Sequence, residues 1–240
     1  MALPLPFDPR TAALLPPVDD LPLVDPARLT PEALRARFAN PPEWQADTEV
    51  ERFWRAAQPV PAAVLIPLVI RQVATAGEPA VLSVLLTQRT AHLKAHAGQV
   101  SFPGGRKDEG DVDAKATALR EAQEEVGLPP ERVEVIGELP PYITGTGFVV
   151  TPVVGLVHAR PDEGVALELT PEPCEVAEIF EVPLAFLMNP ANHQQRAALS
   201  GEMEMRYFSM PWRAPGRDED FFIWGATAAM LRNLYRFLAA

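Results

Sequence analysis

The chain has 240 residues, of which 48% are hydrophobic and 22% charged, and its formal net charge at pH 7 is −11. This composition predicts a globular protein with a sizeable core, and the acidic balance argues against broad nucleic-acid binding. Cys174 is the only cysteine, which excludes an internal disulfide and favours a reducing compartment, the cytoplasm. The longest apolar stretch, residues 60–70, contains two prolines and is shorter than the roughly 18 residues of a membrane span.

Residues 1–56 are expected to form a Pro-rich, partly helical extension that wraps over the domain formed by residues 57–240. Of the 27 prolines, 11 lie within the first 60 residues, where each removes a backbone donor and restricts the chain. One helix is predicted in this extension, with Thr30 as its N-cap, Pro31 at its first position and an end before residues 40–42. A second short helix is expected to hold Trp44 and Trp54, both as packing residues.

From residue 60 onward, strands and helices mix without strict alternation. Gly and Pro turn signals separate apolar, β-rich runs from stretches with helical periodicity. We predict strands over residues 63–70, 81–88, 133–139, 148–158 and 179–182, helices over 113–126 and 223–238, and a loop over 160–175. This order predicts an α/β domain with a mixed sheet.

The most informative segment is Arg120-Glu121-Ala-Gln-Glu124-Glu125-Val-Gly-Leu. On a helix, Glu121, Glu124 and Glu125 share one face, where a hard divalent cation would offset their mutual repulsion. Arg120 is expected to lie off that face and to orient Glu121 or the preceding turn through a salt bridge. The alternative interpretation is a solvated acidic helix face. The nearby Gly104-Gly105 pair favours a phosphate and metal site, because small residues let a backbone approach a ligand closely.

Residues 105–128 resemble the Nudix box, the glycine–x5–glutamate–x7–arginine–glutamate signature of the Nudix hydrolases. Two departures stand out: Asp111 replaces the first glutamate, and eight residues rather than seven separate it from Arg120. The resemblance implies a Nudix-type α/β/α sandwich that hydrolyses nucleoside diphosphates linked to another group. It also implies Mg²⁺ or Mn²⁺ held by three glutamates and the carbonyl of a glycine. The implied metal ligands are Glu121, Glu124, Glu125 and Gly104.

A narrower resemblance covers residues 85–89 and 98–105, which look like the extra motif of the coenzyme A pyrophosphatase subfamily. Lys94 stands where that motif usually has arginine. This resemblance implies cleavage of coenzyme A (CoA) or acyl-CoA to 3′,5′-ADP and 4′-phosphopantetheine or its acyl form. The chain has no Asp or Glu between Pro79 and Lys107, so its cations could hold an anionic substrate despite the net charge. The expected substrate-binding residues are Arg89, Lys94, Gly104, Gly105 and Arg106.

The general base remains open at this stage. Glu124 is the candidate within the box, and Glu178 and Glu175 are candidates outside it. Two other functions also stay open: a Nudix hydrolase for another dinucleotide such as ADP-ribose or NADH, and a Nudix-fold binding protein without catalysis. A small-molecule substrate is the expected partner, and a homodimer is possible, whereas neither nucleic acid nor a membrane is expected.

Overall fold

The computed structural model describes residues 7–17, 21–47, 59–71, 80–93, 96–158, 167–200 and 203–240. Strands β2 (Val60–Arg71) and β8 (Phe148–Val157) run parallel along the middle of a large sheet. Its other pairs are antiparallel, so the sheet is mixed, as predicted. The remaining strands of this sheet are β3 (Val81–Arg89), β4 (Val100–Ser101), β5 (Gly104–Arg106), β6 (Val133–Glu138), β7 (Tyr142–Ile143) and β9 (Val176–Pro183).

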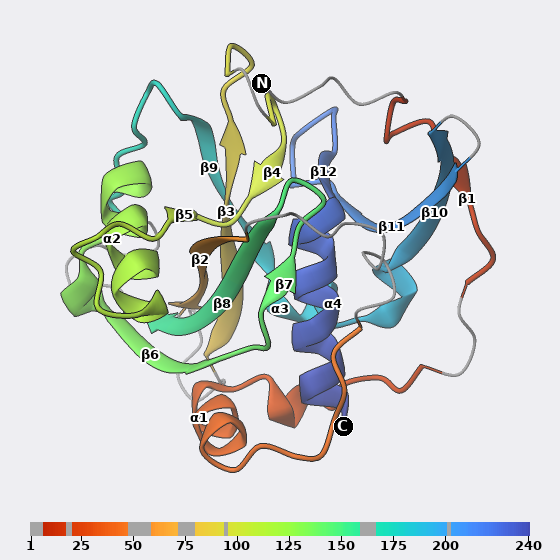
Figure 1. Ribbon diagram of the computed structural model, residues 1–240. Helices are drawn as coiled ribbons and strands as arrows, with labels where there is room; N and C mark the ends of the chain where they lie inside the picture. Colours follow the sequence, from red (N-terminus) through yellow and green to blue (C-terminus); the bar gives the residue numbers. More distant parts are fainter. Residues whose placement is uncertain are drawn as a thin grey trace.

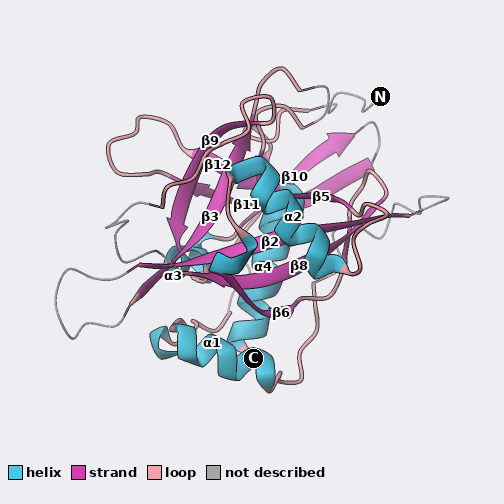
Figure 2. Cartoon of the chain, turned by 90° about the vertical axis from the view of Figure 1, so that its left-hand side faces the viewer, coloured by secondary structure: helices cyan, strands magenta, loops and turns pink. Residues whose placement is uncertain are grey.

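Helices cover the two faces of this sheet. Alternate residues of β2 point to opposite sides: Leu65 belongs to the core cluster beneath α2 (Ala114–Val126), and Ile66 to the cluster that contains α4 (Gly225–Ala239). The same arrangement appears in two views, where α2 and α4 lie on opposite sides of the strands (Figures 1 and 2). Burial on both faces explains the near-continuous apolar sequence of β2. The α/β/α layering is therefore confirmed.

A second sheet was not predicted. It is antiparallel, in the order β1 (Ala13–Leu14), β10 (Gln194–Ser200), β11 (Met203–Trp212) and β12 (Phe221–Trp224). The predicted closing helix over residues 223–238 is wrong at its start, because Ile223 pairs with Met210 inside β12. The helix begins at Gly225, whose positive φ of 59° breaks the strand. Short helical turns complete the described chain: α3 (Leu184–Leu187), η1 (Pro26–Arg28), η3 (Pro130–Arg132) and η4 (Pro190–Asn192).

The N-terminal segments pack against the end of the chain. Helix α1 (Pro31–Ala39) starts where predicted, with Thr30 Oγ accepting a hydrogen bond from the amide of Ala33. Phe38 packs on Phe237 of α4, with ring centroids 4.6 Å apart. The predicted helix around Trp44 is wrong, because residues 41–47 have no helical structure, and Trp54 lies outside the described residues. None of the helices in the described ranges has the length and apolarity needed to cross a membrane.

Candidate active site

Helix α2 presents the acidic segment between two well-defined ends. Asp113 caps its start, with Oδ1 accepting from the amide of Ala116 at 2.8 Å, and Gly127 ends it in the left-handed conformation at φ 67°. Ala118 and Ala122 are fully buried against the sheet. Because the helix is fixed at both ends and along its apolar face, the positions from which its carboxylates project are fixed as well.

Glu125 is the most buried of the three helix carboxylates. Its Oε2 accepts a hydrogen bond from the amide of Gly104 at 3.2 Å, and its Oε1 lies 3.6 Å from Nη1 of Arg89. Burial raises the pKa of Glu125 to about 7, although both contacts oppose that rise. Arg89 also lies 3.9 Å from Glu175, and its Nε is buried without a hydrogen-bond partner among the described residues. The site thus holds a buried carboxylate next to a cation with spare hydrogen-bonding capacity.

Arg120 connects the other two glutamates to the preceding loop. Its Nη1 lies 2.9 Å from Glu121 and 3.0 Å from Glu124, so the expectation that it points away from the carboxylate face is wrong. The expected salt bridge to Glu121 is present. Arg120 also donates from Nη2 to the carbonyl of Arg106 and pairs with Asp111. One guanidinium therefore connects Glu121 and Glu124 on α2 with Arg106 and Asp111, which precede the helix.

The two glycines have different neighbours. A Cβ on Gly105 would lie 2.6 Å from the carboxylate of Glu121, whereas a Cβ on Gly104 would lie 2.5 Å from the backbone oxygen of Ala63. Gly105 is thus required for the position of Glu121, and Gly104 for the pairing of β5 with β2. Arg106 is exposed and lies over the ring of Phe148, 5.1 Å from its centroid.

Glu178 does not join the helix carboxylates. It shares its side of β9 with Phe180, which packs in the α4 cluster, whereas Ile179 packs in the α2 cluster on the other side. Its carboxylate pairs with Arg217 at 2.6 Å. Arg217 was not predicted as a site residue, because nothing in the spacing of residues 213–220 connects this loop with β9. Lys94, the remaining predicted substrate ligand, lies outside the described residues.

The carboxylates fit a hard divalent cation by their chemistry. Burial raises the pKa of Glu121 as well as that of Glu125, so a nearby cation would stabilise the ionised form of both. As the described side chains are placed, no group of three or more His, Cys, Asp or Glu residues is arranged to hold a metal ion. Nη1 of Arg120 binds one oxygen of Glu121 and one of Glu124, so the second oxygen of each carboxylate is the one that Arg120 leaves for a metal.

Comparison with known proteins identifies the family. The NUDIX domain pattern matches residues 62–200, more than half of the chain. This chain is a Nudix hydrolase. It is 44% identical over 174 residues to the uncharacterized Nudix hydrolase NudL of Escherichia coli K12, covering 72% of this chain and 80% of NudL. The NudL of Citrobacter koseri is likewise 44% identical, over 180 residues. Among solved structures, the Nudix hydrolase RenU from M. smegmatis is 25% identical, with a TM-score of 0.40 over 59% of this chain and 80% of RenU.

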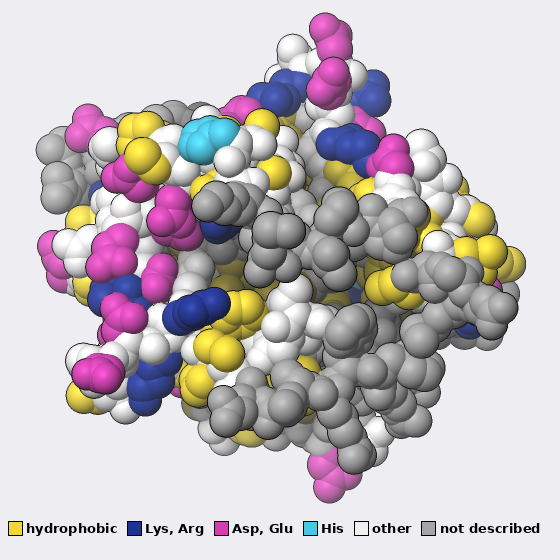
Figure 3. All heavy atoms as spheres, turned by 45° about the horizontal axis from the view of Figure 1, so that its top comes forward, with side chains coloured by type: hydrophobic (Ala, Val, Ile, Leu, Met, Phe, Trp, Pro, Cys, Tyr) yellow, Lys and Arg dark blue, Asp and Glu magenta, His cyan; other side chains and the backbone are white. Residues whose placement is uncertain are grey.

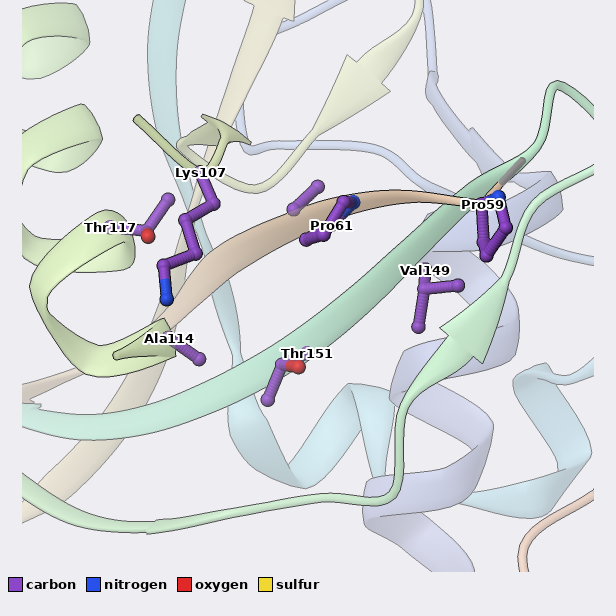
Figure 4. A pocket seen from close by; sticks show the side chains of 8 residues that line it. Pro59, Pro61, Lys107, Ala114, Thr117, Val149 and Thr151 are labelled. Carbon is purple, nitrogen blue, oxygen red and sulfur yellow. The ribbon is translucent and has the colours of Figure 1, made fainter. Parts of the chain in front are cut away.

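The charged groups of the Nudix hydrolase are visible on one face. Acidic side chains gather with several basic ones on the side of the molecule where α2 lies (Figure 3). A cavity of about 400 Å³ lies beside the start of α2, where Lys107 projects between Thr117 and the strands β2 and β8 (Figure 4). None of Glu121, Glu124 and Glu125 lines this cavity. The carboxylates of the Nudix box therefore lie outside this cavity.

Proposed function

We propose that this Nudix hydrolase cleaves the diphosphate bond of CoA or acyl-CoA, releasing 3′,5′-ADP and 4′-phosphopantetheine or its acyl form. One observation carries the proposal: the carboxylate of Glu125 lies between Arg89 and the amide of Gly104. Arg89 and Gly104 belong to the segment that resembles the CoA pyrophosphatase motif, and Glu125 belongs to the Nudix box. The two motifs thus meet at one carboxylate, as a shared substrate and metal site requires.

In this proposal Glu121, Glu124 and Glu125 hold Mg²⁺ or Mn²⁺, with the carbonyl of Gly104 as a further ligand. When bound, the divalent cation neutralises charge on the diphosphate and activates water. Arg120 orients Glu121 and Glu124 through the contacts described above. One of Glu124, Glu175 and Glu178 serves as the general base, and of the two outside the box it is Glu175 that lies 3.9 Å from Arg89.

We propose that basic residues between Pro79 and Lys107 bind the substrate. The Nε of Arg89 is buried with no hydrogen-bond partner in the part of the chain that the structure describes, and Arg106 is exposed on Phe148, so we propose that both bind the phosphates of an anionic substrate. Gly104 and Gly105 are proposed to contact the substrate through their backbone groups, and Lys94 is proposed as a further phosphate ligand. We also propose a cytoplasmic location and a homodimer.

The deciding experiment is product analysis on CoA, acetyl-CoA, ADP-ribose and NADH with Mg²⁺. We expect 3′,5′-ADP from CoA and acetyl-CoA, with much slower turnover of the two substrates that lack the 3′-phosphate and pantetheine arm. Faster cleavage of ADP-ribose or NADH would instead favour a different dinucleotide. Intact substrates throughout would favour a binding protein with a Nudix fold.

A further inference from the structure

Glu175 lies in the turn that leads into β9, next to the candidate site. Backbone hydrogen bonds attach this turn to helix α2: the amide of Glu172 donates to the carbonyl of Glu125 at 2.9 Å, and the amide of Glu175 donates to the carbonyl of Glu172 at 3.0 Å. Strand β9 begins only at Val176, so the alternation of side chains along the strand does not apply to Glu175. Its position is set instead by its contacts.

These contacts place Glu175 on the same side of the sheet as the carboxylates of the Nudix box. Nη2 of Arg89 lies 3.9 Å from Oε2 of Glu175, and Nη1 of the same guanidinium lies 3.6 Å from Oε1 of Glu125. Burial is the main cause of the raised pKa of Glu121 and Glu125, and the nearby negative charge of Glu175 adds to the rise in both. Glu175 is therefore a fourth carboxylate at this site.

Glu175 differs from the other two candidates for the general base in what binds its oxygens. Glu124 accepts a hydrogen bond from Arg120 at 3.0 Å. Glu178 lies on the opposite face of the sheet and is bound by Arg217. Within the described ranges, no hydrogen bond is made to the carboxylate of Glu175, whose side chain is 47% exposed to solvent. A general base must accept a proton from water, and both oxygens of Glu175 are open to one.

Thr90 holds the backbone of Glu175 at the end of β3. Its side chain is buried, its amide donates to the carbonyl of Glu175 at 3.0 Å, and its Oγ1 donates to the carbonyl of Cys174 at 3.2 Å. Thr90 directly follows Arg89, whose guanidinium contacts both Glu125 and Glu175. The end of β3 thus supplies the cation beside this carboxylate and the anchor of its backbone.

We propose that Glu175 is the general base and that Thr90 is its positioning residue, an inference that rests on the proposed diphosphatase function. In this proposal the attacking water lies between Glu175 and the carboxylates of the Nudix box, on the α2 side of the sheet. Glu175 accepts a proton from this water while the water oxygen forms its bond to phosphorus. The bridging P–O bond of the diphosphate breaks in the same reaction, and the leaving phosphate keeps the electron pair.

The test measures kcat and KM for CoA with Mg²⁺ in the wild type and in E175Q, E175A, T90V and T90S. E168Q is the matched control, because Glu168 is an exposed carboxylate in the segment that leads to the same turn. The Mg²⁺ concentration for half-maximal rate distinguishes a base from a metal ligand. Thermal unfolding of every variant checks that folding is retained.

We expect E175Q and E175A to lower kcat by about 10²-fold or more, since a general base contributes about 10²–10⁴-fold. KM and the Mg²⁺ requirement should stay within about twofold of wild type. Sodium formate should restore part of the activity of E175A, because a small carboxylate can accept the proton in place of the missing side chain. T90V should lower kcat by about two- to tenfold, the value of one hydrogen bond, and T90S should recover it because serine keeps the hydroxyl.

Three results would overturn Glu175 as the base: equal activity of E175Q and E168Q, a large rise in the Mg²⁺ requirement of E175Q, or no effect of formate on E175A. Full activity of T90V, or equal losses in T90V and T90S, would overturn the role of Thr90. If the wild type cleaved ADP-ribose instead of CoA, the CoA assignment alone would fail, and the same comparison on ADP-ribose would still decide the role of Glu175.

Discussion

Arg120 donates two parallel hydrogen bonds to Asp111, from Nε to Oδ1 at 3.1 Å and from Nη2 to Oδ2 at 2.9 Å. The two residues stand nine positions apart, one on α2 and the other in the loop before it. Asp111 is buried, and hydrogen bonding from Arg120 keeps its pKa well below the usual value of a carboxyl group. The loop before α2 therefore accommodates the extra residue between Asp111 and Arg120. Asp111 anchors Arg120, which in turn binds Glu121 and Glu124.

Replacing Asp111 with Asn should lower turnover without abolishing substrate binding. The amide keeps the shape of the side chain but removes the charge that holds Arg120, and the loss of such outer partners typically costs about 10–100-fold in activity or metal affinity. The measurement is kcat and the Mg²⁺ concentration for half-maximal rate. Asp108→Asn is the control, since its carboxylate is 70% exposed and lies 3.8 Å from Arg120. Equal rates for the two variants would show that Asp111 does not orient the site.

Gly105→Ala should lower the activity of the enzyme more than its folding stability. Its new Cβ would lie 2.6 Å from the carboxylate of Glu121, a flexible side-chain end that can move away. We expect a loss of activity of about tenfold or more, because displacement of a catalytic group by about 1 Å can cost about 10²-fold. Gly110→Ala is the control, since no atom lies within 4 Å of its added Cβ. Activity assays and thermal unfolding of both variants separate the two effects, and full activity of Gly105→Ala would contradict the placement of Glu121.

Glu125→Gln should remove the response of the protein to divalent metal. In wild type, Mg²⁺ or Mn²⁺ at ten to a hundred times its dissociation constant should stabilise the fold by about 1.4–2.7 kcal/mol, and EDTA should reverse this. The variant should lose this stabilisation together with activity. Its stability without metal should match or exceed that of wild type, because a buried amide carries no charge to desolvate. Glu131→Gln, at an exposed position, should keep the metal response. A retained response in Glu125→Gln would exclude Glu125 as a ligand.

His193 should make the stability depend on pH. It is buried, its Nε2 donates to the carbonyl of Leu187 at 2.6 Å, and its Nδ1 accepts from Arg232 at 3.1 Å. Burial lowers its pKa to about 4 from an ordinary value of 6.5. Between these values the unfolded chain binds more protons than the folded one, so stability is fully present above pH 6.5 and falls as the pH drops toward 4. The difference corresponds to about 3 kcal/mol at most.

Chemical unfolding at pH 7.5 and pH 5 measures this effect in wild type and in His193→Gln. Glutamine can donate to Leu187 and accept from Arg232 without titrating, so the variant should lose less stability on acidification. Carboxylates that titrate elsewhere contribute equally to both proteins and cancel in the comparison. An identical pH dependence in the two proteins would show that His193 does not carry it.

The sequence alone predicted the elements whose signals are local. These are the N-cap of α1, the ends of α2 and the location of Glu121, Glu124 and Glu125 on one helix. Each follows from residues within a few positions of one another. The small sheet depends instead on pairing between distant segments, such as Ala13 with Ala197. Ile223 was assigned to a helix because its apolar spacing continues that of α4, and only its pairing partner in β11 distinguishes the strand.

The motif by itself predicted a Nudix hydrolase and identified Glu121, Glu124 and Glu125 as the candidate metal ligands. Tertiary structure decided how those carboxylates are partnered: Glu125 turns to Gly104 and Arg89, Glu121 and Glu124 turn to Arg120. It also decided that Glu178 meets Arg217 rather than the helix. The physical reason is that charge pairing depends on distances of a few ångströms between side chains far apart in the chain, and residue spacing along the sequence does not contain those distances.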